Sequence, residues 1–551
     1  MLDSYPLSLP LMWHPSRPSA ASPAPTWAVS LKYLYICACS AFLCTFCFPD
    51  PWDLFHLTLG PVLVWLILAV CIQLNRPKLI PYLAWTVVLS HMSFSHLRRQ
   101  WTDWGGYKFD HTAPQMVMVL KLTSAAWAVH DYYVSRMAKR AGKDAHLSSR
   151  QRAMAIPVPS LLEFAAYIFY FGGLFVGPAF EIAEFRRFVS GDMFLEGAAT
   201  SALAAAEDAS AALDRGAAPA YVVGQIARTP TPSRVTPRVP NPTLPMLRAL
   251  LTSIVFMGGV VTLSERYAFS RLLTPAYLAP ITSVGTLVRR FWRLQLSGFA
   301  ARQQYYSVWL LAEGSCILAG LGFKGVIDNW NMGTASWLKH SVYLRLTPPG
   351  TRPTALTTIA TYATSAIWHG FYPGYYLTFI SGALITETAK ILRRTLRPRA
   401  VATGSATIKL AYDVGGWVLT QSVLNYVVAP FLLLGLDESW SVWKANAFVG
   451  HIGLLVAVVA CKVIGAPRRP APVAGLKAGV AVESDSPAVV LPVNAGKPAS
   501  IFEADASGVK FELDADVMRR AAAAESGRSG SNSPTRRRRK TSPGLRSAVG
   551  A

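Results

Sequence analysis

The stretch that decides the fold is Trp368-His369-Gly370-Phe371-Tyr372-Pro373-Gly374-Tyr375-Tyr376, which lies inside a long apolar segment. A histidine at bilayer depth must face protein or a water-filled cavity, because an ionisable group in hydrocarbon is costly. The polar residues four, eight and eleven positions before it share one helical face with it, and they are Ser365, Thr361 and Thr358. We therefore expect His369 to point at a wet or protein-lined interior, either as a functional group or as a structural histidine bound to a neighbouring helix.

The residues after the histidine predict a break in this helix. Pro373 lacks a backbone N–H and its ring clashes with the preceding turn, so it ends or kinks the helix just after His369. Gly370 and Gly374 have no side chain, and they leave room for another group to approach closely.

The composition places the chain in a membrane. Of its 551 residues, 52% are hydrophobic and 15% are charged, whereas soluble domains carry about 25% charged residues. Apolar segments of about 20 residues recur along the chain, and each is long enough to cross the ~30 Å hydrocarbon core. The sequence therefore predicts an all-α, polytopic transmembrane protein with about nine to eleven transmembrane helices.

The net charge of +23, from 53 basic and 30 acidic residues, fits this class. Basic residues of membrane proteins gather in cytosolic loops, and basic groups at 136–152 and 390–399 each follow an apolar segment. Nucleic-acid binding would need a basic soluble domain, and none is visible in the sequence. We therefore expect membrane lipid, and no nucleic acid, among the partners.

The cysteines predict no metal site. Five of the seven lie in the first two apolar segments, where they are typical of small buried hydrophobic residues. No C-x-x-C pair is matched by a second pair at the spacing of a zinc site.

Regions of different composition suggest the domain organisation. Residues 1–28 are rich in Pro and Ser and predict a loose N-terminal tail, whereas residues 29–465 carry the apolar segments of a transmembrane catalytic domain. Within that domain, residues 197–245 are rich in Ala and Ser and then in Thr and Pro, which predicts a solvent-exposed insertion. Residues 466–551 are polar and basic with few aromatic residues, which predicts a disordered tail.

Five blocks of polar and aromatic residues interrupt the apolar frame. They are Asp110-His111-Thr112 with Gln115-Met116 and Lys121-Leu122; Gly177-Pro178-Ala179-Phe180-Glu181; Tyr305-Tyr306 with Trp309 and Glu313-Gly314; Trp330-Asn331 through Trp337-Leu338 to Tyr343-Leu344-Arg345; and Trp368-His369-Gly370 through Gly374-Tyr375-Tyr376. In this order, over about residues 30–465, they resemble the membrane-bound O-acyltransferases (MBOATs), and within them the fungal, broad-specificity lysophospholipid acyltransferases.

The resemblance implies a fold, an activity and a catalytic pair. It implies helices around an internal tunnel, and transfer of a fatty acyl chain from acyl-CoA to the free hydroxyl of a lysophospholipid in the membrane of the endoplasmic reticulum. Acyl-CoA is then a co-substrate, so we expect no separate cofactor. The resemblance also implies His369 and Asn331 as the catalytic pair.

The chemistry of these two residue types suits acyl transfer. An alcohol is a poor nucleophile at neutral pH, so it needs a base, and an imidazole with an unperturbed pKa near 6.5 is largely deprotonated in the cell. Asn331 has an uncharged N–H donor to orient the hydroxyl or the thioester, although an asparagine there also suits a helix cap at the interface. No Ser or Cys stands beside a base, so direct transfer without an acyl-enzyme is the simpler mechanism.

Further residues are candidates for substrate binding. Coenzyme A carries phosphate charges that favour cytosolic Lys and Arg, and the fourth block contains Lys339 and ends at Arg345. The aromatic residues that would shape the acyl tunnel are Trp337, Tyr343, Tyr375 and Tyr376. The alternatives are ordinary positive-inside patterning for the two basic residues and interfacial packing for the aromatic ones.

One feature departs from the resemblance. Similar proteins carry some tens of residues between the Gly-Leu-Gly-aromatic segment and the Trp-Asn motif, whereas here only Lys324–Asn329 separate Phe323 from Trp330. Two explanations are open: the stretch is dispensable, or an exon is missing from this sequence and the protein is inactive.

Two other functions compete with the leading one. The same chemistry would serve an O-acyltransferase that acts on a protein or a sterol. A transporter that uses His369 as a proton relay is a different class, and it should show internal repeats with paired broken helices. The polar blocks do not recur, so the sequence favours the enzyme.

Overall fold

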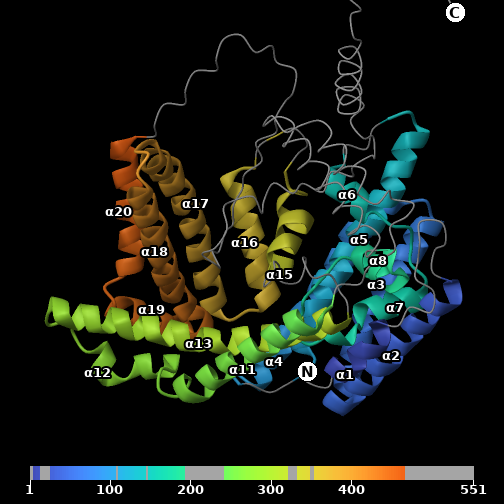
Figure 1. The fold of residues 1–551 in the computed structure, drawn as a ribbon, viewed down its shortest axis with the longest axis horizontal. Helices are drawn as coiled ribbons and strands as arrows, with labels where there is room; N and C mark the ends of the chain where they lie inside the picture. Colours follow the sequence, from blue (N-terminus) through green and yellow to red (C-terminus); the bar gives the residue numbers. More distant parts are fainter. Residues whose placement is uncertain are drawn as a thin grey trace, which may run out of the picture. The chain divides into compact units, whose positions relative to one another are not determined.

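The structure is a computed structural model that describes residues 4–12, 25–106, 110–143, 147–192, 241–319, 332–347, 351 and 353–465. All of these residues belong to one of the two compact units into which the chain divides. They form helices and connecting turns without a β-strand, which confirms the predicted all-α fold class (Figure 1).

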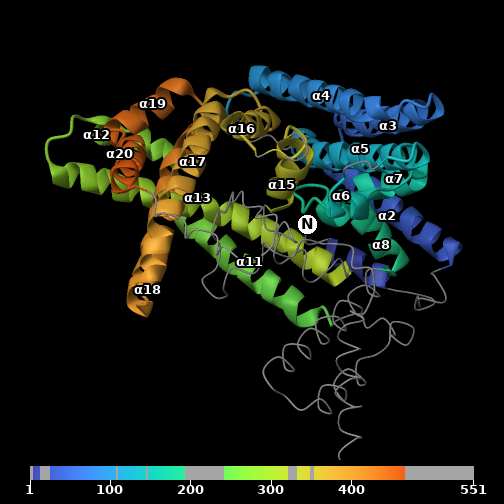
Figure 2. The ribbon, with the colours of Figure 1, turned by 90° about the horizontal axis from the view of Figure 1, so that it is seen from above.

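The N-terminal half of the described chain is built around three long helices. Its elements in order are α1 (Ser4–Ser8), η1 (Leu9–Met12), α2 (Thr26–Cys47), α3 (Pro51–Gln73), η2 (Pro77–Leu79), α4 (Ile80–Thr102), α5 (Thr112–Arg140), α6 (Ser149–Met154), α7 (Leu161–Ile168), η3 (Phe171–Gly173) and α8 (Ile182–Ser190). Helices α3, α4 and α5 pack against one another, and Figure 2 shows them side by side.

The remaining helices carry the predicted site. They are α11 (Thr243–Leu263), η5 (Phe269–Leu273), α12 (Pro275–Leu278), α13 (Val284–Ala319), α15 (Met332–Trp337), the π-helix η6 (Leu338–Tyr343), α16 (Ala355–His369), α17 (Pro373–Ala402), α18 (Ala406–Leu433), α19 (Leu436–Ala445) and α20 (Val449–Ile464). Helix α16 packs against α17 on one side and against η6 and α4 on the others, so it joins the two groups of helices.

Two hydrophobic cores hold these groups together. The larger core draws on α2 to α8 and also contains Trp337 and Trp368, which come from α15 and α16. The smaller core lies among η5, α12, α13, α18 and α19, around Leu294, Tyr426 and Trp443. The two tryptophans therefore connect the histidine segment to the N-terminal core.

Several helices have the length and composition of membrane spans. Four such helices occur among the described residues, α2, α3, α11 and α18, and α19 with α20 forms a fifth if the pair, bent by 65°, is one span. Helices α4, α5, α13 and α17 are each at least 23 residues long but more polar. The chain is thus a polytopic membrane protein. Among the described residues, fewer helices than the predicted nine to eleven are both long and apolar enough to count as membrane spans. The reason is that interior helices carry buried polar groups, such as Lys121 and Asp131 of α5.

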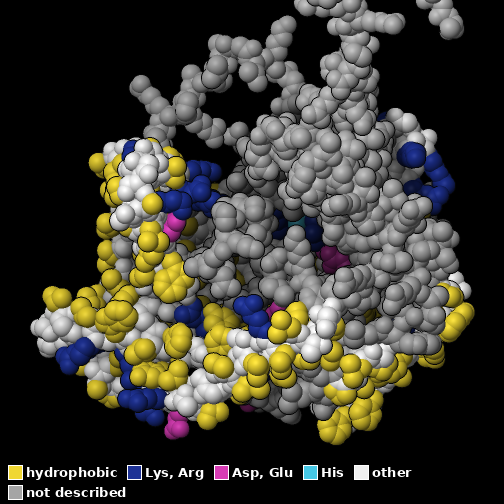
Figure 3. All heavy atoms as spheres, viewed as in Figure 1, with side chains coloured by type: hydrophobic (Ala, Val, Ile, Leu, Met, Phe, Trp, Pro, Cys, Tyr) yellow, Lys and Arg dark blue, Asp and Glu magenta, His cyan; other side chains and the backbone are white. Residues whose placement is uncertain are grey.

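The exposed side chains agree with a lipid environment. Figure 3 shows hydrophobic side chains along the lower edge, where Figure 1 places α11, α12 and α13. Leu251, Val255 and Val261 of α11 are more than half exposed, and so are Leu455 and Val459 of α20. Such helix faces are stable next to lipid tails rather than water.

Two predicted boundaries differ from the structure. Part of the expected loose tail at 1–28 is helical, because Leu11 is buried in the larger core and Ser8 lies 3.3 Å from Ser315 of α13. The expected insertion at 197–245 ends earlier, since α11 begins at Thr243; residues 193–240 lie outside the described residues, as does the tail from 466.

Candidate active site

The helix that carries His369 ends where the sequence predicts. The Thr354 side chain caps its N-terminus in a capping box with Thr357. The helix ends at His369, where Gly370 has a φ of +121°, a value that favours glycine, and Pro373 starts α17. The turn thus presents His369 at a helix terminus.

The polar stripe on α16 faces the protein interior. Thr358 and Ser365 are each 4% exposed, and the Thr361 hydroxyl, which is partly buried, donates to the Thr357 carbonyl. The spacing in the sequence predicts this face correctly.

Aromatic rings enclose His369. Ring centroids lie 4.5 Å away for Trp368, 4.9 Å for Phe431, 5.1 Å for Phe379 and 5.8 Å for Tyr375. Within the part of the chain that the structure describes, no group hydrogen-bonds either ring nitrogen of the histidine. The described residues therefore fix the ring by aromatic packing.

Trp337 lies next to this enclosure and is a buried part of the core. It is 3% exposed, and its indole N–H donates to Thr123 Oγ1 over 2.8 Å. Its ring stacks on Trp85 at 5.7 Å and lies 6.1 Å from the ring of Trp368. The column of three tryptophans sets the start of η6 beside the end of α16, and substrate contact by Trp337 stays a prediction.

Arg345 has a protein partner. Its two terminal nitrogens donate to Asp131 over 2.8 and 2.5 Å, and its guanidinium lies 4.0 Å from the ring centre of Trp127. Asp131, which is 3% exposed, also accepts from His130 Nδ1 over 3.0 Å. The bidentate pair holds the residues just after η6 to α5. Much of the hydrogen-bonding capacity of Arg345 is therefore used within the protein and not available to a phosphate.

Positive charge nevertheless gathers around η6. Burial, followed by the charges of Arg150, Lys339 and Arg345, lowers the pKa of His340 to about 3. Lys339 and Tyr343 are half-buried on the same element. No ion pair of Lys339 occurs among the described side chains, whereas Arg345 is paired with Asp131. Of the two predicted phosphate ligands, Lys339 is therefore the one whose charge is not already paired.

Of the three predicted tyrosines, the structure brings Tyr375 into ring contact with the histidine. Tyr375 lies in the first turn of α17 and packs on both His369 and Phe431, with ring centroids 5.8 and 4.6 Å away. Tyr376 is the next residue and is half-buried, and it makes neither of these ring contacts.

Asn331 and the short Lys324–Asn329 connection lie outside the described residues. Helix α15 begins directly after Asn331, and a Cβ on its Gly333 would lie 2.9 Å from the Ala179 carbonyl oxygen. Helix α15 therefore packs closely on the second block of the sequence, Gly177–Glu181.

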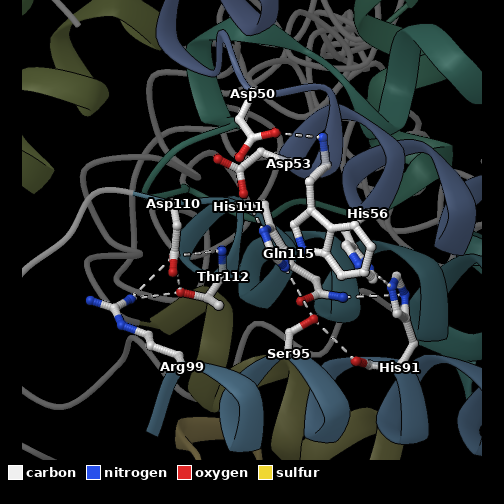
Figure 4. Close-up of polar contacts among 11 residues, drawn as sticks. Asp50, Asp53, His56, His91, Ser95, Arg99, Asp110, His111, Thr112 and Gln115 are labelled. Atoms are coloured by element: carbon white, nitrogen blue, oxygen red, sulfur yellow. Dashed lines mark hydrogen bonds and ion pairs between the residues drawn. The ribbon is translucent and has the colours of Figure 1, made fainter. Parts of the chain in front are cut away.

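The first block belongs to a polar cluster between α3, α4 and α5 (Figure 4). His111 lies 2.6 Å from Asp53 through Nδ1 and 3.2 Å from Ser95 Oγ through Nε2. This order resembles a Ser-His-Asp triad, but Ser95 is 2% exposed and its hydroxyl donates to the His91 carbonyl. An alcohol so enclosed has no room for an acyl group, so the cluster is structural.

Sequence reasoning did not find the role of Lys121, which binds the end of another helix. Lys121 is 1% exposed, and its ammonium donates to the carbonyls of Tyr167 and Ile168 over 3.2 and 3.1 Å. These are the last carbonyls of α7, which have no partner within their own helix. No cluster of three or more potential metal ligands occurs among the residues that the structure describes.

Comparisons with known proteins agree with this architecture. A model of the MBOAT, membrane-bound O-acyltransferase family, matches residues 99–429. The chain is 32% identical to the lysophospholipid acyltransferase of Schizosaccharomyces pombe over 416 residues, which are 70% of this chain and 72% of the relative.

Two more distant relatives carry similar names. The lysophospholipid acyltransferase of Saccharomyces cerevisiae is 31% identical over 412 residues, which are 68% of this chain and 61% of the relative. Lysophospholipid acyltransferase 6 of Drosophila melanogaster is 27% identical over 488 residues, which are 83% of this chain and 59% of the relative.

Proposed function

The chain belongs to the membrane-bound O-acyltransferase family, and from this premise we propose that it transfers a fatty acyl chain from acyl-CoA to the free hydroxyl of a lysophospholipid. The names of the relatives support the lysophospholipid acceptor. The observation that carries the proposal is the enclosure of His369, a potential base, by four aromatic rings at a helix end. We propose the endoplasmic reticulum as the membrane.

His369 serves as the general base. Its free ring nitrogen accepts the proton of the lysophospholipid hydroxyl while the alcohol oxygen attacks the thioester carbonyl carbon. The C–S bond then breaks, and the protonated imidazole returns the proton to the departing thiolate of coenzyme A. The products are a diacyl phospholipid and free coenzyme A.

Asn331 serves as the donor to the developing negative charge. Its amide N–H is uncharged and costs less to bury than a Lys or Arg would, yet it stabilises the oxyanion of the tetrahedral intermediate. No separate cofactor takes part.

The substrates meet at His369 from two sides. Lys339 supplies positive charge for the phosphates of coenzyme A, and Arg345 holds the η6 segment in place through Asp131. Tyr375 and Trp337 form the wall next to the reacting groups, while Tyr343 and Tyr376 contact the acyl chain further along.

The acceptor class is tested with microsomes from cells that express the chain. Labelled acyl-CoA is supplied with a panel of lysophospholipids, with a sterol, or with a peptide acceptor. We expect label in diacyl phospholipid only, above the level of cells without the chain. Label in the sterol or the peptide alone would overturn the proposed acceptor, and fractionation of the same cells tests the compartment.

A further inference from the structure

The carbonyl of Trp368 has an unusual partner for a helix end. The last carbonyls of a helix have no N–H donor within the helix. In α16 the Gly370 N–H donates to the carbonyls of Ala366 and Ile367. The Trp368 carbonyl instead accepts a hydrogen bond from Nε2 of His96, over 3.2 Å. The donor lies on α4 and is 272 residues away in the sequence.

The imidazole of His96 also lies close to Gly370. A Cβ on Gly370 would lie 3.4 Å from both Cγ and Nδ1 of His96, so the ring packs directly against the residue after His369. His96 is buried, at 9% exposure. One side chain therefore contacts the backbone immediately before and immediately after the proposed base.

Helix α4 is itself braced at this point. Ser95 is joined to His111 and through it to Asp53 of α3, and Arg99 donates to Thr112 over 2.7 Å and to Asp110 over 3.3 Å (Figure 4). Both braces lie within one turn of His96. They tie its helix to the Asp110-His111-Thr112 block at the start of α5.

We infer that His96 is a positioning residue for His369, and that the Asp110-His111-Thr112 block acts by bracing the helix that carries His96. This inference rests on the proposed function, in which His369 is the base. The Nε2–H of His96 fixes the last peptide of α16, and this sets where the imidazole of His369 stands relative to the hydroxyl it deprotonates.

A positioning role has a kinetic signature that a merely stabilising role lacks. Nothing places His96 in contact with either substrate, so its loss should leave KM within about twofold of the wild type. A displaced base lowers kcat, and a misplacement of about 1 Å can cost ~100-fold. We expect kcat to fall ~10- to 100-fold.

The test compares two replacements of similar size. His96→Leu fills the space but has no donor, whereas the side-chain N–H of His96→Gln occupies about the place of Nε2. We expect the low kcat in His96→Leu and recovery to within about threefold of the wild type in His96→Gln. His451→Ala is the control: this histidine bonds Ser381 and Tyr426, away from α4, and its loss should not change kcat.

The outcomes separate this inference from the proposed function. If the wild type transfers no acyl chain to any lysophospholipid, the proposed function fails. If the wild type is active, His369→Ala is inactive and His96→Leu keeps full kcat, the positioning role alone is wrong. Equal kcat losses in His96→Leu and His96→Gln also overturn it. Should His96→Leu not accumulate, His96→Asn, too short to reach the carbonyl, replaces it in the comparison.

Discussion

The guanidinium of Arg345 and the carboxylate of Asp131 form a bidentate pair, with N–O distances of 2.8 and 2.5 Å. The pair joins α5 to the residues just after η6, across 214 positions of sequence. It accounts for an arginine that the sequence assigns to coenzyme A, because much of its hydrogen-bonding capacity is already used.

Asp131→Asn should therefore destabilise the protein. The change leaves a largely buried guanidinium without its countercharge, which typically costs about 3–5 kcal/mol when a buried pair is broken. We expect a lower melting temperature in detergent and lower abundance. Asp413→Asn breaks the exposed Lys409–Asp413 pair on α18, and it should change stability by only about 0–1 kcal/mol. Equal effects of the two changes would contradict the structural role of Asp131.

Gly374→Ala should be poorly tolerated. A Cβ there would lie 2.0 Å from the Pro430 carbonyl oxygen, and the Gly374 N–H donates to Leu434 over 2.8 Å. Helices α17 and α18 would have to separate, at a cost of about 1–3 kcal/mol. Gly415→Ala is the matched control on α18, since nothing lies within 4 Å of its Cβ position. Thermal unfolding of both variants in detergent is the measurement, and equal melting temperatures would refute the close contact.

Trp337 and Thr123 should be energetically coupled. Trp337→Phe keeps an aromatic ring but loses the indole N–H, and Thr123→Val removes the acceptor. A double-mutant cycle on unfolding free energy should give a coupling of about 1 kcal/mol. Trp417→Phe, at an exposed site on α18, should have no coupling to Thr123→Val. A coupling near zero for the first pair would mean that the hydrogen bond does not hold α15 to α5.

Lys339 should act on the affinity for acyl-CoA rather than on turnover. Lys339→Ala removes the freer positive charge on η6, so KM for acyl-CoA should rise ~3- to 10-fold, a cost of up to about 1.4 kcal/mol. We expect kcat to stay within about twofold. Lys409→Ala, on α18, should leave both constants unchanged. An unchanged KM in Lys339→Ala would remove this residue from the coenzyme A site.

The sequence predicts local features of the site well. The 3.6-residue period places Thr358 and Ser365 on the buried face of α16, and Pro373 marks the start of the next helix. These features depend on residues within one or two helical turns of each other, so they can be predicted from the local sequence.

Features that depend on distant partners could not be predicted. The carboxylate of Asp131 and the carbonyls that bind Lys121 come from other helices, and only the fold brings them together. The same holds for His96: its sequence context does not indicate a role, and its partner, the Trp368 carbonyl, lies on α16. The helical N-terminus was also missed, because Leu11 gains its burial from α13 and its neighbours.

The central claim is that His369 is the base for acyl transfer. The most direct test is the initial rate at which His369→Ala converts labelled acyl-CoA and a lysophospholipid into diacyl phospholipid, at an abundance and membrane insertion equal to those of the wild type. Removal of the imidazole leaves the binding groups in place but removes the proton acceptor, so we expect the rate to fall at least ~100-fold. A variant that is inserted normally and keeps a rate within a few-fold of the wild type would contradict the account.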